Sequence, residues 1–490
     1  MSLIEQRPSA VSAALAKDRL GVPSVVFFVI SAAAPLMVVA GSVPTAYAVT
    51  GVIGVPFAFL MLGAIFALFA VGYVTMARHV VNAGAFYAYA AQGLGRTQGV
   101  ATAWVALLAY NALQLGLYGI IGSAAEPLLD DWFGVSPPWW VIALVAWALV
   151  GVLGLLRVDV NGKILSVLLV SEIAVVLVFD LGGLLNAGPA GVTFEGFDPG
   201  SLFVPGVGAA LATVVAGFAG VESSVVFAEE SKDRDRTVPT ATYVGIAIIA
   251  ILYAISAWAQ TVPTGPDGIV EAATEQGTTL IFNQATAHMG SAVATIGSLL
   301  FVTSSLACMI AFHNTTARYI FALGRENVLP QVFGRTSART AAPVTGSVLQ
   351  TGLGLVVIAV YAVFGLDPVT KLFFTFGAFG GLGLLTLLTV TSIAVIVYFS
   401  RNPAQETAWR TRIAPALAAL ALTVIIVLTL INFDTVLGVA PGSPIRWILP
   451  GIFVVAIVLG VLWARVLKVT RPEIYANIGL GARAASGDSK

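Results

Sequence analysis

The stretch from Leu20 to Ala77 reads LGVPSVVFFVISAAAPLMVVAGSVPTAYAVTGVIGVPFAFLMLGAIFALFAVGYVTMA and contains no Asp, Glu, Lys or Arg. A helix that crosses a bilayer needs only about 20 apolar residues. The stretch is too long for one such helix, so it predicts two, separated near Gly51–Gly54. A cleavable signal peptide would have a single short apolar region instead. We therefore expect the chain to begin with one membrane span that leads into a second.

The composition of the whole chain agrees with this start. Of its 490 residues, 58% are hydrophobic and 10% are charged, against about 25% charged residues in an average soluble domain. So few charges cannot cover a water-exposed surface, which excludes a soluble enzyme. A net charge of +0 without any basic run argues against nucleic-acid binding. The single cysteine, Cys308, excludes an internal disulfide and a cysteine-built metal site. We expect neither a metal nor a cofactor.

Twelve apolar segments are long enough to be membrane helices. The alternating pattern of barrel strands is missing from the sequence, so helices are the structure that satisfies the backbone in lipid. We therefore predict an all-α integral membrane protein. The predicted spans are residues 24–49, 54–77, 98–121, 138–156, 162–186, 204–228, 239–262, 289–318, 344–364, 369–398, 413–432 and 445–466.

Basic residues lie almost entirely on one side of these spans. Of the 24 Lys and Arg residues, only Lys371 and Arg446 fall outside that side, whereas the opposite loops carry acids such as Glu126 and Asp131. Cytoplasmic loops are rich in Lys and Arg. We therefore predict a multi-pass protein of a cell membrane with both termini in the cytoplasm. The abundance of Ala, Gly and Val is typical of a GC-rich bacterial genome, so we expect a bacterial inner membrane. The polar tails, Met1–Lys17 and Gly479–Lys490, are expected to be disordered.

Two of the predicted spans are interrupted near their middle. The first contains Ser31-Ala-Ala-Ala-Pro35 and the sixth contains Gly217-Phe-Ala-Gly-Val-Glu222. Transporters often bind substrate where broken helices free backbone N–H and C=O groups at mid-membrane. Gly and Pro also serve helix packing, but these breaks lie in the first helix of each of two five-helix sets. We predict that the backbone of Ala34–Val39 and Gly217–Val221 builds a binding site.

Three stretches resemble motifs of the amino acid–polyamine–organocation (APC) permeases. Residues 217–239, GFAGVESSVVFAEESKDRDRTVP, are similar to the family's G-F-x-G-x-E-S…E-E-x-K signature. Residues 83–89, AGAFYAY, resemble A-G-G-x-Y-x-Y, from which Ala85 and Phe86 depart. Residues 317–330, ARYIFALGRENVLP, resemble R-x-x-x-A-x-(G/A)-R-(D/E)-(G/N)-x-L-P. The resemblance implies the leucine-transporter fold. In that fold helices 1–5 and 6–10 form an inverted repeat, helices 1 and 6 are discontinuous, and two further helices are peripheral.

The resemblance also implies a division of the chain and a set of site residues. The division is an N-terminal tail at 1–20, a transport core at 21–398, helices 11 and 12 at 399–470, and a C-terminal tail at 471–490. Tyr110 and Gln114 occupy positions that line the family's pocket, although both could instead bond neighbouring helices. The full predicted substrate-binding set is Ala34, Pro35, Met37, Val38, Val39, Tyr110, Gln114, Gly217, Phe218, Ala219, Gly220 and Val221.

Two acids in mid-membrane spans are predicted to carry protons. Glu222 lies in the sixth span, where an ionised carboxylate costs roughly 2.5–3.5 kcal/mol to insert, and the family places an acid there. Glu172 lies in the fifth span, where many relatives carry Lys. Either acid could instead be structural. Hydroxyls of Thr303, Ser304 and Ser305 could coordinate sodium, but such groups usually bond their own helix.

The predicted function is secondary active transport of an amino acid or small amine, with proton coupling. The substrate class comes from the resemblance alone. Alternatives are a polyamine or organocation transporter, an exchanger without proton coupling, and an ion channel. A catalytic constellation of nucleophile and base is not visible, so we expect no enzyme. Expected partners are the substrate, protons and lipid, with the chain as a monomer or homodimer. The charged residues expected to form an inner gate are Glu229, Glu230, Lys232, Arg234, Arg236, Arg325 and Glu326.

Overall fold

The computed structural model describes residues 20–80, 82, 84–155, 158–228, 231–337 and 339–481, apart from the side chains of residues 158–166 and 168. Within this part of the chain every regular element is a helix. Its one pairing of β type is an isolated bridge between Leu20 and Ser231. The predicted all-α class is therefore confirmed.

Nine α-helices have between 18 and 38 residues. These are α4 (Val55–His79), α6 (Arg96–Phe133), α8 (Val158–Leu185), α12 (Arg234–Thr264), α15 (Ser291–Arg325), α16 (Val344–Val363), α17 (Thr375–Arg401), α18 (Ala414–Ile431) and α20 (Ile448–Thr470).

The remaining helical elements are shorter. The α-helices among them are α1 (Val22–Ala33), α2 (Pro35–Met37), α3 (Val43–Thr50), α5 (Phe86–Gly93), α7 (Trp139–Leu153), α9 (Pro199–Leu202), α10 (Val207–Gly217), α11 (Ser223–Val226), α13 (Ile269–Gln276), α14 (Leu280–Met289), α19 (Phe433–Leu437) and α21 (Pro472–Asn477). The π-helical turns are η1 (Val38–Ser42), η6 (Pro368–Phe374) and η7 (Trp409–Ile413). The 3₁₀ turns are η2 (Glu195–Phe197), η4 (Gly277–Thr279), η5 (Gln331–Gly334) and η8 (Pro444–Trp447).

Nine helical segments of the described chain are long and apolar enough to cross a membrane. They overlap nine of the twelve predicted spans. The other three predicted spans coincide with α7, α8 and the pair α10–α11. Here α7 has 15 residues and α10 has 11, fewer than the roughly 20 that one straight spanning helix needs. The count of twelve spans and the inverted repeat stay predictions.

The outward faces of the peripheral helices are apolar. Val356 on α16, Leu420 on α18 and Val454 on α20 are 59%, 65% and 61% exposed. Exposing so much apolar surface to water is unfavourable, whereas contact of the same surface with apolar lipid tails has no such cost. This outer surface and the nine apolar segments identify a multi-pass membrane protein.

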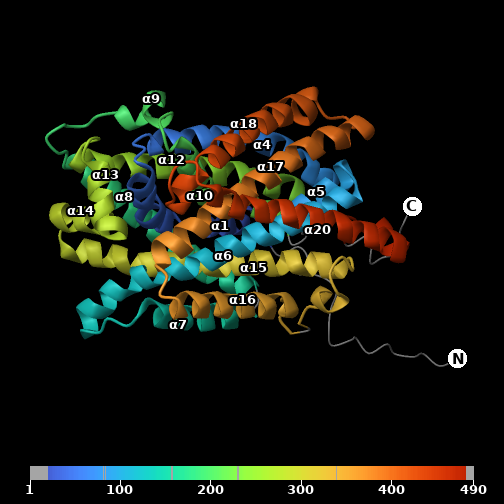
Figure 1. Ribbon diagram of the computed structural model, residues 1–490, viewed down its shortest axis with the longest axis horizontal. Coiled ribbons are helices and arrows are strands. Elements are labelled where there is room, and N and C mark those ends of the chain that lie inside the picture. Colours follow the sequence, from blue (N-terminus) through green and yellow to red (C-terminus); the bar gives the residue numbers. More distant parts are fainter. Residues whose placement is uncertain are drawn as a thin grey trace.

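The helices run largely along one direction of the bundle (Figure 1). In its interior α6 packs against α15, α17 and α20, and α12 lies along α4. The first broken helix enters this core, because α1 packs against α8, α12 and α15. The second does so from the other side, because α10 packs against α17, α18 and α3.

The C-terminal segment is tied to the bundle by one buried acid, Glu326, which follows α15. Its carboxylate accepts hydrogen bonds from Asn82 Nδ2 at 2.8 Å and from the backbone N–H groups of Gly479 at 2.6 Å and Gly481 at 2.8 Å. The Tyr87 hydroxyl donates to the same carboxylate. Burial raises the pKa of Glu326, and these four donors oppose that shift.

This arrangement corrects the expectation of a disordered tail at its start. Gly479 and Gly481 are buried against Glu326, because a buried carboxylate needs several donors and glycine N–H groups can approach it closely. Residues 482–490 and the N-terminal tail up to residue 19 lie outside the described part of the chain.

We predict that Glu326→Ala releases the segment from Pro472 to Gly481. Hydrogen bonds to a charged group contribute about 1.5–3 kcal/mol each, so amide hydrogen exchange at Gly479 and Gly481 should rise more than about tenfold. Glu473→Ala, which removes an exposed acid from α21, is the matched control and should leave exchange unchanged. Equal exchange in the wild type and in the Glu326 variant would show that other contacts hold the segment.

Candidate functional site

The first membrane segment breaks at Ala34, as predicted. The helix α1 ends at Ala33, and Ala34 adopts a left-handed backbone with φ 44° and ψ 77°. The cause is local, because Pro35 disfavours the α conformation in the residue before it and lacks an N–H group. The chain continues through α2 and the π-helical η1 before α3 begins at Val43.

The second break lies between α10 and α11, also as predicted. The helix α10 ends at Gly217, and Phe218–Glu222 form a turn before α11 starts at Ser223. Gly220 has φ 108°, a conformation that glycine adopts without strain. A Cβ atom at Gly220 would collide with the Cβ atom of Ala32 on α1. The two breaks are therefore in direct contact.

Side chains from neighbouring helices bond the backbone groups that the first break frees. Tyr253 on α12 donates to the Ala33 carbonyl at 2.8 Å, and Cys308 on α15 donates to the Ala32 carbonyl at 3.2 Å. Gln260 on α12 donates to the Val39 carbonyl at 3.0 Å. These contacts fix the unwound backbone and place α12 and α15 around it.

Glu172 contacts the same region through Ser304. The Ser304 hydroxyl donates to the Glu172 carboxylate at 2.6 Å and accepts from the Met37 backbone N–H at 3.3 Å. Glu172 is thus one hydroxyl away from the broken first segment. Thr303 and Ser305, the two other hydroxyls considered for sodium, donate to carbonyls of their own helix.

Glu222 holds the second break together. Its carboxylate accepts from Tyr110 on α6 at 2.9 Å and from the Gly220 N–H at 3.0 Å. Its backbone carbonyl accepts from Tyr73 on α4 at 3.0 Å. The carboxylate therefore links the turn to α6. Tyr110, predicted as a pocket residue, supplies this link.

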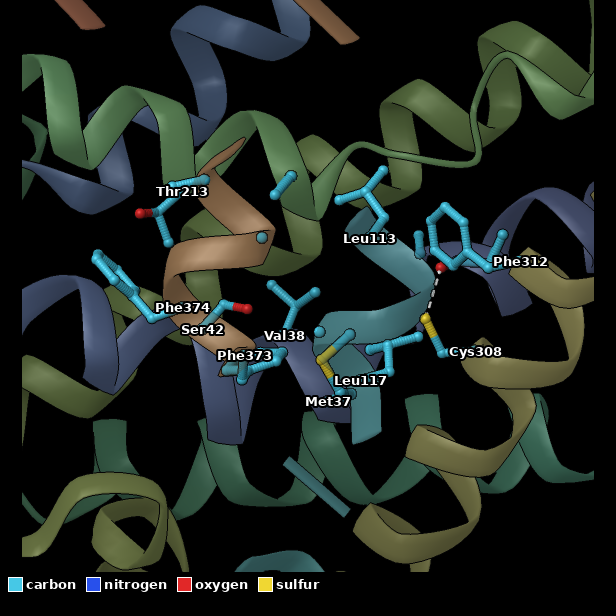
Figure 2. A pocket seen from close by; sticks show the side chains of 16 residues that line it. Met37, Val38, Ser42, Leu113, Leu117, Thr213, Cys308, Phe312, Phe373 and Phe374 are labelled. Carbon is cyan, nitrogen blue, oxygen red and sulfur yellow. Dashed lines mark hydrogen bonds between the residues drawn. The ribbon is translucent and has the colours of Figure 1, made fainter. Parts of the chain in front are cut away.

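A cavity of ≈ 40 Å³ lies beside the breaks, and Figure 2 shows side chains from several helices converging on it. A water needs about 10–15 Å³ measured in this way, so a substrate requires the lining to move apart. None of the lining side chains is charged. The lining residues are Ala32, Ala33, Met37, Val38, Ser42, Leu113, Gly116, Leu117, Thr213, Ala216, Cys308, Phe312, Phe373, Phe374, Gly377 and Ala378.

Only part of the predicted substrate-binding set lies on this cavity. Met37 and Val38 line it, whereas Ala34, Pro35 and Val39 lie in the same segment without lining it. From α6 the cavity takes Leu113, Gly116 and Leu117, not the buried residues Tyr110 and Gln114. From the sixth predicted span it takes Thr213 and Ala216, not the turn residues Gly217, Phe218, Ala219, Gly220 and Val221. The role of each predicted residue in binding stays a prediction.

Several lining residues were not foreseen from the sequence. Phe312 lies on α15, and Phe373, Phe374 and Gly377 lie on η6 and α17. The available signal was the run of two Phe residues followed by small residues at positions 377 and 378. Such a pattern is equally typical of ordinary helix packing. Of the predicted inner-gate residues, Glu229 and Glu230 lie outside the described part of the chain.

Comparisons with known proteins place the sequence among permeases. The family model described as amino acid permease matches residues 24–472. The chain is 25% identical over 331 residues to the low-affinity putrescine importer PlaP of Escherichia coli strain K12, covering 65% of this chain and 67% of that protein. The PlaP protein of Escherichia coli O157:H7 gives the same values.

We predict that Gly220→Leu abolishes transport while the protein still inserts. The backbone at position 220 has a positive φ, which is strained for leucine, and the leucine side chain would collide with Ala32. Uptake into proteoliposomes should fall to background, while the yield and gel-filtration profile stay comparable. Gly352→Ala on α16 is the control, because a Cβ atom there meets nothing within 4 Å. Wild-type uptake in the Gly220 variant would show that the turn tolerates a side chain.

Proposed function

The chain belongs to the amino acid permease family, within the APC superfamily, and from this premise we propose that it is a secondary active transporter. It moves an amino acid or a small amine across the cell membrane by alternating access. In this proposal both termini lie in the cytoplasm, which the distribution of Lys and Arg along the sequence supports. Binding and release of the substrate require no catalytic step.

The observation that carries this proposal is the position of the cavity. It is lined by the first helix break, by α10 just before the second break, and by α6, α15, η6 and α17, and its side chains carry no charge. The carbonyl end of α1 carries partial negative charge, and the N-terminal end of the helical segment that starts at Pro35 carries partial positive charge. The Ala32 and Ala33 carbonyls already accept from Cys308 and Tyr253, but a carbonyl oxygen has a second lone pair for an ammonium. A zwitterionic amino acid presents the complementary pair, an ammonium and a carboxylate. The backbone can therefore supply polarity while the side chains supply shape.

The cavity lining favours a small neutral side chain on the substrate. Met37, Val38, Leu113 and Leu117 surround the cavity with aliphatic groups. Such a surface gains from burying apolar substrate atoms and offers no partner for a second charge. We therefore expect a neutral, small or aliphatic amino acid as the preferred substrate.

A polyamine substrate is the second candidate, and two observations favour it. The relative PlaP is described as a putrescine importer. The rings of Phe312, Phe373 and Phe374 all line the cavity, and aromatic faces attract ammonium groups. A diamine would place one ammonium against these rings and the other at the carbonyl end of α1.

Substrate counterflow tests the function and separates the two candidates. Purified protein in liposomes preloaded with unlabelled compound should accumulate the same labelled compound. A screen of neutral amino acids, arginine, putrescine and spermidine would identify the class. We expect counterflow with a neutral amino acid, whereas counterflow with putrescine alone would select the second candidate. Single-channel conductance without counterflow would contradict a transporter.

We further propose that proton movement is coupled to transport through Glu222 and Glu172. Each carboxylate lies in the membrane interior and is 2% exposed. Each contacts a break, Glu222 through the Gly220 N–H and Glu172 through Ser304. A rearrangement of either break therefore changes the donors of one carboxylate. Coupling requires that proton affinity differ between the two facing states, and in this proposal the exchange of donors at each carboxylate supplies that difference.

We predict that Glu222→Gln keeps exchange and loses accumulation. The Gln carbonyl can accept from the Gly220 N–H while its amide donates to the Tyr110 oxygen, so both contacts survive without a titratable group. Counterflow should stay within about twofold, since neutral hydrogen-bond swaps change free energies by about 0.5–1.5 kcal/mol. Uptake driven by an inward proton gradient should disappear. Glu172→Gln should show the same loss to a smaller extent.

The matched control is Glu271→Gln, which changes an exposed acid on α13 and should leave both assays unchanged. Full proton-driven accumulation in both Gln variants, singly and combined, would make the two acids structural. It would also support an exchanger without proton coupling. Counterflow in the same variants would still report on the transporter itself.

A further inference from the structure

A third buried acid, Asp180, lies apart from both breaks. It belongs to α8 and is 3% exposed. Its Oδ2 atom accepts from the Ser256 hydroxyl on α12 at 2.8 Å. Its Oδ1 atom has no hydrogen-bond partner among the described residues. One of the two carboxylate oxygens is thus occupied and the other is open.

Gln260 is one helical turn after Ser256 on α12, and it has a second open oxygen. This side chain is 2% exposed. Its Nε2 atom donates to the Val39 carbonyl in η1 at 3.0 Å. Because a carbonyl only accepts, this bond determines the orientation of the Gln260 side-chain amide. Its Oε1 atom finds no partner within the described part of the chain.

Asp180 and Gln260 line the same small cavity between α8, α12 and α14. Its volume is ≈ 10 Å³, about the space of one water molecule or one bare ion. Gln284 on α14 also lines this cavity. Its Nε2 atom donates to the backbone carbonyl of Gln260 at 3.0 Å, and the side-chain Oε1 atom of Gln260 stays open. Its remaining lining residues carry no ionisable side chain.

Two open acceptor oxygens on one cavity need a shared partner that is either a hydrogen-bond donor, such as a water, or a cation. Each open buried acceptor carries a desolvation cost, and a second acceptor beside it cannot relieve that cost. One of the two belongs to a carboxyl group without a basic side chain in the lining. Carboxylate and amide oxygens are the ligands that hard cations prefer.

We propose that this cavity binds one sodium-sized monovalent cation through Asp180 Oδ1 and Gln260 Oε1. The site is separate from the Ser304–Glu172 contact, which lies two helical turns away along α8 and already satisfies its carboxylate through a hydroxyl. Gln260 joins the cation to the Val39 carbonyl, so an occupied site stabilises η1 in the broken first segment. The cation need not move with the substrate.

The proposal is tested by sodium binding to the purified full-length protein in detergent. Thermal unfolding and binding of radioactive sodium are measured in sodium chloride and in choline chloride of equal ionic strength. We expect the Tm to rise with sodium and to saturate, as for a ligand that binds only the folded state. Sodium binding should weaken as the pH falls, because protons compete for Asp180.

Asp180→Asn should weaken sodium binding by about tenfold or more, since cation affinity depends on the number of charged ligands. Glu172→Gln is the matched control, because it neutralises another buried carboxylate of the same helix and should keep the sodium effect. Absence of sodium binding and of a sodium-dependent Tm in the wild type overturns the proposal, whether or not the variant folds. A Tm that depends on pH but not on sodium also overturns it. Equal sodium binding in Asp180→Asn, or loss only in Glu172→Gln, overturns it as well.

Discussion

The structure depends on one constraint, which is that every backbone polar group inside a membrane needs a partner within the protein. An unbroken helix meets this constraint by itself. The two breaks, at Ala34 and at Phe218–Glu222, do not, and side chains must complete them. Tyr253, Cys308 and Ser304 bond the first break, and Glu222 bonds the second. The polar side chains of the core are therefore placed by the breaks.

The same constraint explains why so much of the fold could be predicted from the sequence. An apolar run of about 20 residues has few alternatives to a membrane helix, so the segments were visible without any contact information. The positions of the breaks could also be predicted, because Pro35 disfavours a helical residue before it and Gly220 supplies a positive φ. Both are local effects of single residues. The end of the chain was less predictable, since Gly479 is held by bonds to residues far away in sequence, namely Glu326, Tyr87 and Gln92.

The cavity lining could not be predicted in the same way, because it depends on how helices far apart in sequence are rotated. On α6 the cavity takes Leu113 and Leu117, while the neighbouring Tyr110 turns to Glu222. Tyr110 and Leu117 are seven residues apart and so lie on the same face of α6. The two sets of contacts therefore differ in their level along the helix, and that level is set by how α6 packs against the other helices. Phe373 and Phe374 belong to the π-helical η6, whose wider turn changes the direction of these side chains relative to a regular α-helix. Asp180 was missed because a single acid near the end of a span gives no sign of which helix it faces.

Glu222, Glu172 and Asp180 are buried between the long helices, and what surrounds each acid differs. This difference distinguishes the roles that we propose for them. Both carboxylate oxygens of Glu222 accept hydrogen bonds, and Glu172 accepts from a hydroxyl that also bonds the broken segment. These two acids therefore respond when a break rearranges. Asp180 contacts helices that run without a break at that level, and its open oxygen faces a cavity of atomic size. An acid whose donors belong to a moving element suits coupling, whereas an acid held by continuous helices suits a fixed ligand. Gln260 links the two regions, because its side chain bonds the Val39 carbonyl in η1 and also lines the Asp180 cavity.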